Sequence, residues 1–259
     1  MKASLKYAIY AAAAVACIAL LVFLNRENSR RRAMLTCQDL KITIVDSTMG
    51  SFVSAADVKE YIVAEAGPWK GRRVDSIKLW QLEEILEKKA AILSSEAYMS
   101  TDGILHIEIR QRRPVARFHS STSSFYADAS GYIFPIRKKY SARIPIIDGE
   151  FPFHEDREFR GEITDKKGRA WMNGMIGLLR YIEGNKTWRN AIVQITSAAD
   201  GSLTLVPAEG DEVFLFGYPE HWKEKFKKIE KYYEYIAPRE NGKKYKTVNV
   251  RYKGQIICR

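Results

Sequence analysis

The strongest constraint on the fold of this chain is an apolar run at residues 5–24, which reads LKYAIYAAAAVACIALLVFL. Lys6 is the only charged residue within it. Because a helix rises about 1.5 Å per residue, a run of about 20 residues matches the roughly 30 Å hydrocarbon core of a bilayer. We therefore predict one membrane-spanning helix over this run. Its representative positions are Leu5, Tyr10, Cys17 and Leu24.

Two other interpretations of this run are weaker. A cleaved signal peptide would use Lys2 and Lys6 as its basic start. However, the apolar stretch continues past Ala16 and ends at Arg26, not at a small-residue cleavage site. Lipid attachment at Cys17 is disfavoured because the apolar stretch continues beyond that cysteine. The pattern favours a retained anchor.

Charge alone leaves the orientation of this anchor open. Lys2 and Lys6 precede the run, whereas Arg26 and the arginines at 30–32 come after it. The positive-inside rule counts basic residues close to the membrane, and it slightly favours a cytoplasmic position for the bulk of the chain. We assign residues 1–4 to a short tail and residues 25–36 to a linker.

Composition limits the possible folds and partners of the chain beyond the anchor. About 230 of the 259 residues remain, which is enough for two modest domains. The aromatic content of 12% is typical of a folded chain. The net charge of +11 would suit nucleic acid, acidic lipid or an acidic protein. Because the basic residues are scattered, without a recognition helix, we predict a solvated basic surface and no nucleic-acid partner.

Residues 37–113 have the pattern of a small α+β domain. A strand is predicted at 40–45, and Ser54 with Asp57 forms a capping-box pattern that opens a short helix. A second helix is predicted from the apolar positions Leu79, Leu82, Ile85, Leu86, Ala90 and Leu93. A hairpin then turns at 101–103, and its second strand should bury Leu105, Ile107 and Ile109.

Residues 114–259 read as a β-rich domain with flanking helices, so the fold class of the whole chain is α+β. One helix face carries Trp171, Met175, Leu178 and Ile182. A hairpin is predicted from 203–206 and 213–216, and a last helix from about 220 to 235. The expected inner stripe of that helix is Trp222, Phe226, Ile229 and Tyr233, and its expected outward lysines are Lys223, Lys227, Lys228 and Lys231.

Catalytic patterns are missing from the sequence. The four histidines have no metal-ligand spacing, and there is no G-x-S-x-G elbow, Walker loop or dinucleotide fingerprint. The serines at 120–124 read as a polar linker, and Glu155 with Asp156 as a solvated loop. We predict no catalytic residue, no metal and no cofactor. Whether Cys37 and Cys258 pair is left open, because pairing requires the two ends of this region to meet.

Several motifs carry a family resemblance. The order strand, helix, helix, strand, strand resembles a POTRA domain, the polypeptide-transport-associated module. Four later segments resemble, in order, the R-x-P-V-A, D-x-x-G-x-x-F, I-P-x-I-x-G and V-D-L-R-Y motifs of the bacterial cell-division family FtsQ/DivIB. They lie at 112–116, 128–134, 144–149 and 248–252. Asn249 departs from the aspartate that the family commonly has, which leaves open any contact that needs a carboxylate there.

The resemblance implies a non-enzymatic divisome scaffold in the bacterial cytoplasmic (inner) membrane at the division septum. Its amino terminus would be cytoplasmic and its bulk extracytoplasmic. Its partners would be bitopic proteins of the FtsB/DivIC and FtsL types, which connect to septal peptidoglycan synthesis. Two other functions stay open: a POTRA-type chaperone of an export or outer-membrane assembly machine, and a membrane-anchored hydrolase.

The resemblance also places the partner site on the last strand, at 245–252. We expect this strand to be a sheet edge that can accept another strand. Arg251 matches the family arginine that meets an acidic partner residue. The expected partner-binding residues are Tyr245, Val248, Asn249, Val250, Arg251 and Tyr252. The alternative is an ordinary closing strand with a solvated arginine.

Overall fold

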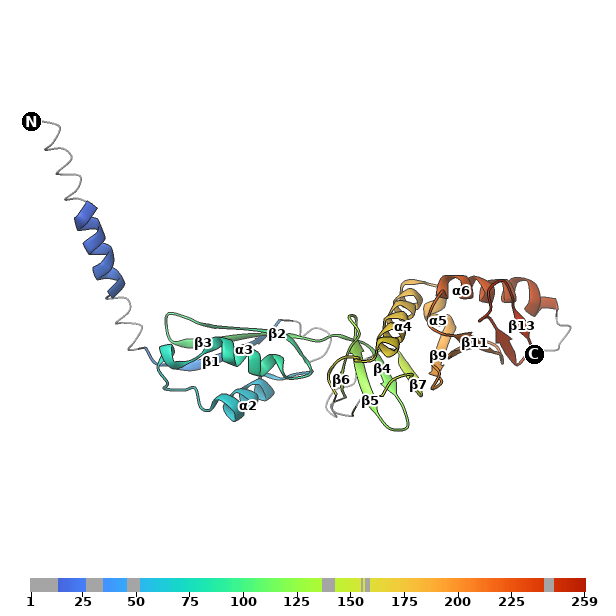
Figure 1. The fold of residues 1–259 in the computed structure, drawn as a ribbon, viewed down its shortest axis with the longest axis horizontal. Coiled ribbons are helices and arrows are strands. Elements are labelled where there is room, and N and C mark those ends of the chain that lie inside the picture. The colour runs from blue at the N-terminus through green and yellow to red at the C-terminus, as the bar shows by residue number, and fades with distance from the viewer. Residues whose placement is uncertain are drawn as a thin grey trace, which may run out of the picture. The chain divides into compact units, whose positions relative to one another are not determined.

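The computed structural model describes residues 14–26, 35–45, 52–136, 143–154, 156, 159–239 and 245–259. The chain divides into two compact units, Met1–Gln111 and Arg112–Arg259. Figure 1 labels many of the helices and strands of both units. Each unit is described by itself.

A helix at residues 14–26 precedes the first sheet. Cys17 and Leu24 lie in it with exposed side chains, whereas Leu5 and Tyr10 fall outside the described residues. Within the described part of the chain, no helix combines the length and the apolar character that a bilayer crossing requires.

The first unit has the predicted order of strand, helix, helix, strand, strand, with one short 3-10 turn added. Its sheet has the order β1-β3-β2, with β1 parallel and β2 antiparallel to β3. The elements are β1 (Asp39–Ile44), α2 (Ala55–Ala66), η2 (Val74–Ser76), α3 (Leu79–Glu87), β2 (Ile92–Met99) and β3 (Ile104–Gln111).

The core of this unit lies between the helices and one face of the sheet. Leu105, Ile107 and Ile109 alternate along β3 and are fully buried, as predicted. They share one apolar cluster with buried side chains of both helices: Val58, Ile62, Leu82 and Leu86. The two helices therefore cover the same face of the sheet.

The capping box at the start of α2 is confirmed. The Ser54 hydroxyl accepts from the backbone N–H of Asp57 at 3.1 Å, and the Asp57 carboxylate accepts from the backbone N–H of Ser54 at 2.9 Å. Both contacts satisfy donors that the first helical turn leaves free. The helix begins where the sequence predicts.

The predicted end of the second helix is wrong. Ala90 and Leu93 do not lie on it, because α3 ends at Glu87 and β2 begins at Ile92. Ile92 is 1% exposed, whereas Leu93 is 52% exposed. Pairing of β2 with β3 supplies hydrogen bonds that outweigh the weak helical repeat at 90 and 93.

The second unit is built on a ten-stranded sheet with the order β13-β12-β11-β10-β9-β7-β4-β5-β6-β8. Its strands are β4 (Pro114–His119), β5 (Ser124–Asp128), β6 (Tyr132–Pro135), β7 (Ile146–Gly149), β8 (Gly161–Glu162), β9 (Ile192–Ser197), β10 (Leu203–Pro207), β11 (Val213–Gly217), β12 (Thr247–Asn249) and β13 (Ile257–Cys258). Its helices are α4 (Lys166–Gly184), α5 (Trp188–Ala191) and α6 (Trp222–Lys231), followed by a π turn, η3 (Tyr232–Ile236), and a 3-10 turn, η4 (Ala237–Arg239).

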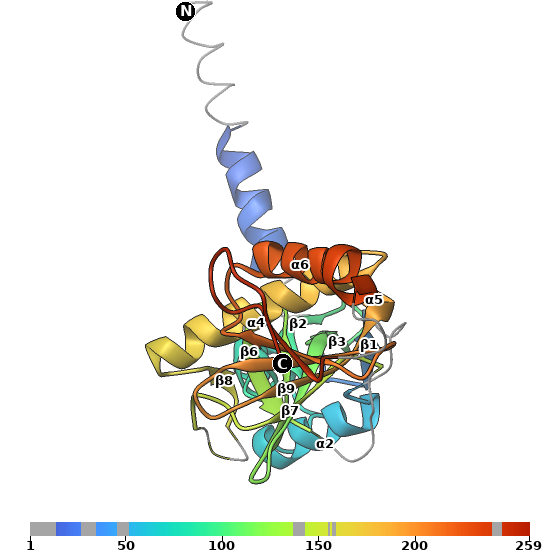
Figure 2. The ribbon, with the colours of Figure 1, turned by 90° about the vertical axis from the view of Figure 1, so that its right-hand side faces the viewer.

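The helices α4, α5 and α6 lie on the same side of this sheet (Figure 2). The predicted stripe of α4 is confirmed, because Trp171, Met175, Leu178 and Ile182 are all buried. They join the sheet residues Phe118, Ile147, Leu205 and Phe214 in one core. The Trp171 indole N–H also donates to the Gly201 carbonyl at 2.8 Å, which ties α4 to the loop before β10.

Pro114 opens β4, where the first position of a strand tolerates a residue without an N–H. One further detail differs from the prediction. The last helix changes to a π turn at Tyr232, and the wider turn places Tyr232 inside at 2% exposure and leaves Tyr233 at 39%. Tyr233 is thus a poor member of the inner stripe, whereas Phe226 and Ile229 are fully buried, as predicted.

Gly149 allows β7 to pack tightly against β9. Its φ is +113°, and a Cβ there would overlap the Ser197 carbonyl oxygen of β9. We expect Gly149→Ala to lower the free energy of unfolding by about 3 kcal/mol, from backbone strain plus the clash. Urea denaturation followed by tryptophan fluorescence measures this loss. The control is Gly184→Ala at the end of α4, where a Cβ meets no atom within 4 Å and should be neutral. Equal effects would contradict this explanation.

Candidate partner-binding site

The predicted partner strand at 245–252 does not form the outer strand of the sheet. β12 pairs in parallel with β11 and antiparallel with β13, so the prediction of an edge strand at 245–252 is wrong. After Tyr252 the chain turns through Gly254, whose φ is +70°, and returns as β13. Gly254 was the available sequence signal for this turn, because glycine adopts a positive φ at no steric cost. A strand of two residues is too short to show a pattern.

The predicted binding residues divide into an inner and an outer group. Val248 and Val250 are fully buried, and Tyr245 is partly buried against the same core. Their side chains hold the segment in place. Asn249 is partly buried, whereas Arg251 and Tyr252 are exposed. The outer group, Asn249, Arg251 and Tyr252, is the surface that a partner could contact, and we call it the Arg251 corner.

Local contacts set the direction of Arg251. The amide oxygen of Asn249 accepts from the backbone N–H of Arg251 at 3.1 Å and from its Nε at 3.2 Å. A Cβ on Gly217 would lie 2.7 Å from Cγ of Arg251, so the glycine makes room for the arginine stem. The guanidinium carbon is 5.7 Å from the centre of the Tyr252 ring. An amide at 249 therefore serves to orient the arginine.

An acidic side chain also faces this corner. Hydrogen bonds from the side chain and backbone of Ser202 hold the pKa of Asp200 below its usual value, and the positive charge of Arg251 lowers this pKa further. Asp200 follows β9, far from Arg251 in sequence. The corner thus combines a cationic group with an anion of the same chain that is close enough for their charges to interact.

The sequence predicted that Lys228 lies on the solvated face of the last helix, and this prediction is wrong. Its ammonium donates to the Val250 carbonyl and, at 2.7 Å, to the Tyr252 carbonyl. Partial burial lowers the pKa of Lys228, and Glu224 partly offsets this shift. The two hydrogen bonds fasten α6 to the chain on both sides of Arg251. The helical repeat could not reveal them, because they depend on where the chain returns after β12.

Lys225 is a second unexpected interior group. It is 6% exposed, and its ammonium donates to the Tyr218 carbonyl at 2.7 Å and lies 4.9 Å from the centre of the Phe216 ring. Burial lowers the pKa of Lys225 from 10.5 to about 8, although Glu220 opposes the shift. The hydrogen bond to Tyr218 fastens α6 to the segment after β11, and burial of the charge is an energetic cost of this contact.

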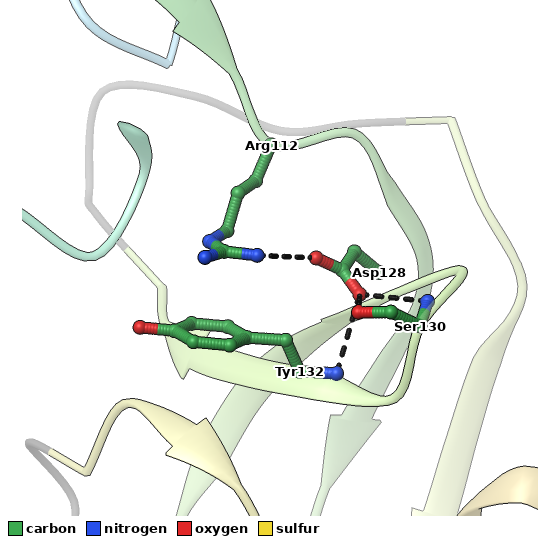
Figure 3. Close-up of polar contacts among 4 residues, drawn as sticks. All are labelled: Arg112, Asp128, Ser130 and Tyr132. Atoms are coloured by element: carbon green, nitrogen blue, oxygen red, sulfur yellow. Dashed lines mark hydrogen bonds and ion pairs between the residues drawn. The ribbon is translucent and has the colours of Figure 1, made fainter. Parts of the chain in front are cut away.

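A second polar cluster joins two of the sequence motifs (Figure 3). Arg112 donates to the Asp128 carboxylate at 2.8 Å, and both side chains are largely buried. The other oxygen of Asp128 accepts from the backbone N–H groups of Ser130 and Tyr132 at 2.9 and 3.2 Å. The guanidinium carbon of Arg112 lies 3.4 Å from the centre of the Tyr132 ring. This arrangement closes the β5–β6 turn over the entry of the chain into the second unit.

The serine run at 120–124 contains the nearest approach to a catalytic pair. Nδ1 of His119 lies 2.5 Å from the Ser124 hydroxyl, on an exposed hairpin. The two residues are cross-strand neighbours of β4 and β5, and strand pairing alone accounts for their contact. The Ser120 hydroxyl accepts from two backbone N–H groups of its own turn. Among the described residues, no group of three metal-ligating side chains gathers.

The buried pair of Arg112 and Asp128 gives a stability prediction. Asp128→Ala leaves the arginine charge buried without its partner and opens the turn, so we expect a loss of about 3 kcal/mol in the free energy of unfolding. The exposed pair of Glu183 and Arg189, 3.7 Å apart, provides the control. Glu183→Ala should cost less than about 1 kcal/mol. Similar losses in urea denaturation would show that burial does not set the effect.

The lowered pKa of Lys225 predicts a pH dependence. Between about pH 8 and the pKa of the unfolded chain, 10.5, the unfolded state binds more protons, so stability should rise with pH. We expect a gain of up to about 3 kcal/mol, at 1.36 kcal/mol per pKa unit. Lys225→Met should remove most of this rise in denaturation curves measured from pH 7 to 10. An unchanged slope would show that Lys225 is not the group responsible.

Above pH 10 a tyrosine should act in the opposite direction. Burial, followed by a hydrogen bond with Glu212, raises the pKa of Tyr233. The folded state then keeps a proton that the unfolded state loses, and stability falls as pH rises further. Between pH 8 and 10, Lys228 adds to the rise because its pKa is also lowered, whereas Cys37 opposes it because burial raises the pKa of its thiol. The contribution of Lys225 is therefore the difference between the parent and Lys225→Met.

Comparison with known families supports the division into two units. The first unit matches the POTRA-like domain over residues 35–110. A comparison with curated proteins gave no match. The second unit carries the Arg251 corner, and its residues 113–259 match the family described as FtsQ/DivIB, C-terminal related. Because this match spans more than half of the 259 residues, the chain belongs to the FtsQ/DivIB family of cell-division proteins.

Proposed function

We propose that this protein is a non-catalytic scaffold of the bacterial division machinery. It binds small bitopic proteins of the FtsB/DivIC and FtsL types and links them to septal peptidoglycan synthesis. The observation that carries the proposal is the family match over 113–259, the part of the chain that holds the Arg251 corner. The POTRA-like match over 35–110 supports it, because this combination of domains is the one that the sequence motifs indicate.

The apolar run at 5–24 is the proposed anchor of the scaffold. In this proposal the amino terminus is cytoplasmic, the helix crosses the cytoplasmic membrane once, and both folded units lie outside it at the division septum. The family supports this orientation, which the flanking charges leave open. A tether of this kind would keep both units close to partners that are themselves anchored in the membrane.

The proposed docking surface is the Arg251 corner. Strand addition to β12 is blocked because β11 and β13 occupy its two sides. The outer strand is β13, and with two residues it offers few main-chain hydrogen bonds. Side chains must therefore supply much of the affinity. The exposed, oriented Arg251 is the strongest candidate to bind an acidic residue of the partner.

Reversing the charge of Arg251 tests this surface. We expect Arg251→Glu to weaken binding of an FtsB/DivIC-type partner by about 2 kcal/mol or more, roughly 30-fold, because attraction to an acidic residue becomes repulsion. The measurement is a titration of the full chain with the partner by isothermal calorimetry. Circular dichroism must first show that the variant is folded.

The matched control reverses another charge on the same unit. Lys227 is exposed on α6, and Lys227→Glu should change the binding free energy by less than about 0.5 kcal/mol. Lys228 is unsuitable as a control because it holds the carbonyls beside Arg251. If Arg251→Glu is folded and binds like the parent, the partner does not dock at this corner.

A further inference from the structure

A pocket of about 680 Å³ lies between α5, the end of β10, the end of α6 and the π turn η3. Trp188, Pro207 and Tyr233 form much of its apolar wall, and Glu209, Glu230 and Glu234 bring three carboxylates to it. We call this site the acidic pocket. It uses the residues around Glu230, whereas the Arg251 corner meets α6 through Lys228.

The charge of the acidic pocket is opposite to that of the protein. The chain has a net charge of +11, yet its three pocket glutamates form no ion pair with any described basic residue. Glu234 interacts with the hydroxyl of its neighbour Tyr235 and raises the pKa of that tyrosine. This contact leaves the negative charge in place. Within the part of the chain that the structure describes, the pocket is therefore an anionic site without an ion-pair partner, on a basic protein.

Glu230 and Glu234 also occupy positions that are unfavourable for negative charge in a helix. Glu230 and Glu234 are four residues apart, so their like charges repel across one turn. They lie at the carboxy-terminal end of α6 and in η3, where the helix dipole disfavours negative charge. Lys227 and Lys231, each three residues before one of these glutamates, offset only part of this cost. A bound cation would relieve both conflicts.

The walls of the pocket suit a particular kind of cation. Aromatic faces beside carboxylates attract ammonium and guanidinium groups, and apolar walls accept the alkyl stem of lysine or arginine. The volume exceeds what a single ammonium group needs. The wall residue Trp188 is 3% exposed, and its indole N–H has no acceptor among the described residues. A peptide carries carbonyl acceptors that a simple amine lacks.

We propose that the acidic pocket binds an extended, lysine- or arginine-containing segment of a protein partner. This is a second docking site on the same unit and goes beyond the proposed function. An acidic segment fits the Arg251 corner, whereas only a basic segment fits this pocket. One partner with both kinds of segment, or two partners, could then be held on the two sides of α6.

A direct test uses the full chain and a fluorescent peptide, acetyl-Ala-Lys-Ala-Arg-Ala-amide. Fluorescence anisotropy should show saturable binding between micromolar and millimolar concentrations that weakens as salt increases. A peptide with glutamine in place of lysine and arginine should not bind. The double variant Glu230→Gln, Glu234→Gln should weaken binding of the basic peptide at least tenfold.

The matched control removes two charges elsewhere on the same segment. Glu220→Gln with Glu224→Gln changes two exposed glutamates, also four residues apart, that do not line the pocket. This control should bind the peptide like the parent. Equal weakening in the two double variants, or no saturable binding up to 5 mM peptide, would overturn the proposal. Butylamine that binds as tightly as the peptide would also overturn it, in favour of a small amine.

Discussion

Burial of Phe226 and Ile229 against the carboxy-terminal strands fixes the rotation of α6 about its own axis. Both side chains are fully buried, and Phe226 contacts the rings of Trp188 and Phe216. At about 100° per residue, Lys225 and Lys228 then fall on one side of this apolar stripe and Glu230 on the other. One packing arrangement therefore places both surfaces that we propose for binding. Loss of this packing would affect both sites together.

The two sides of α6 differ in how their charges are satisfied. Lys225 and Lys228 donate to main-chain carbonyls and serve the structure of the protein itself. Burying these cations costs free energy, which the lowered pKa values of both lysines reflect. Glu230, by contrast, lines the acidic pocket and forms no ion pair with a described basic residue. On the side of Lys225 and Lys228, both lysines are thus bonded within the protein, and only Arg251 is left to bind a partner. On the side of Glu230, we propose that the carboxylate binds a partner.

The sequence predicted those features that depend on neighbours along the chain. The capping box at Ser54, the alternation at Leu105, Ile107 and Ile109, and the stripe from Trp171 to Ile182 are all local patterns, and the structure confirms them. The errors arise where contacts with segments distant in sequence determine the local structure. Leu93 lies in β2, which pairs with β3, and not in the expected helix. β13 pairs with the outer side of β12, so β12 is not at the sheet edge. At the candidate site, the family resemblance pointed to Arg251, but no local pattern indicated the helix lysine, Lys228, that holds its neighbours.

The buried pair of Arg112 and Asp128 shows how two motif residues that are separated in sequence can together fix the pairing register of two strands. An ion pair of this kind adds little net stability compared with apolar side chains of similar size. Its value lies in specificity: a slip of β4 by one residue would exchange its buried and exposed faces. Arg112 lies two residues before β4, and Asp128 ends β5, so their contact fits only one register of this strand pair. The same register sets β4 against β7, and β7 against β9, from which the sheet continues toward the Arg251 corner.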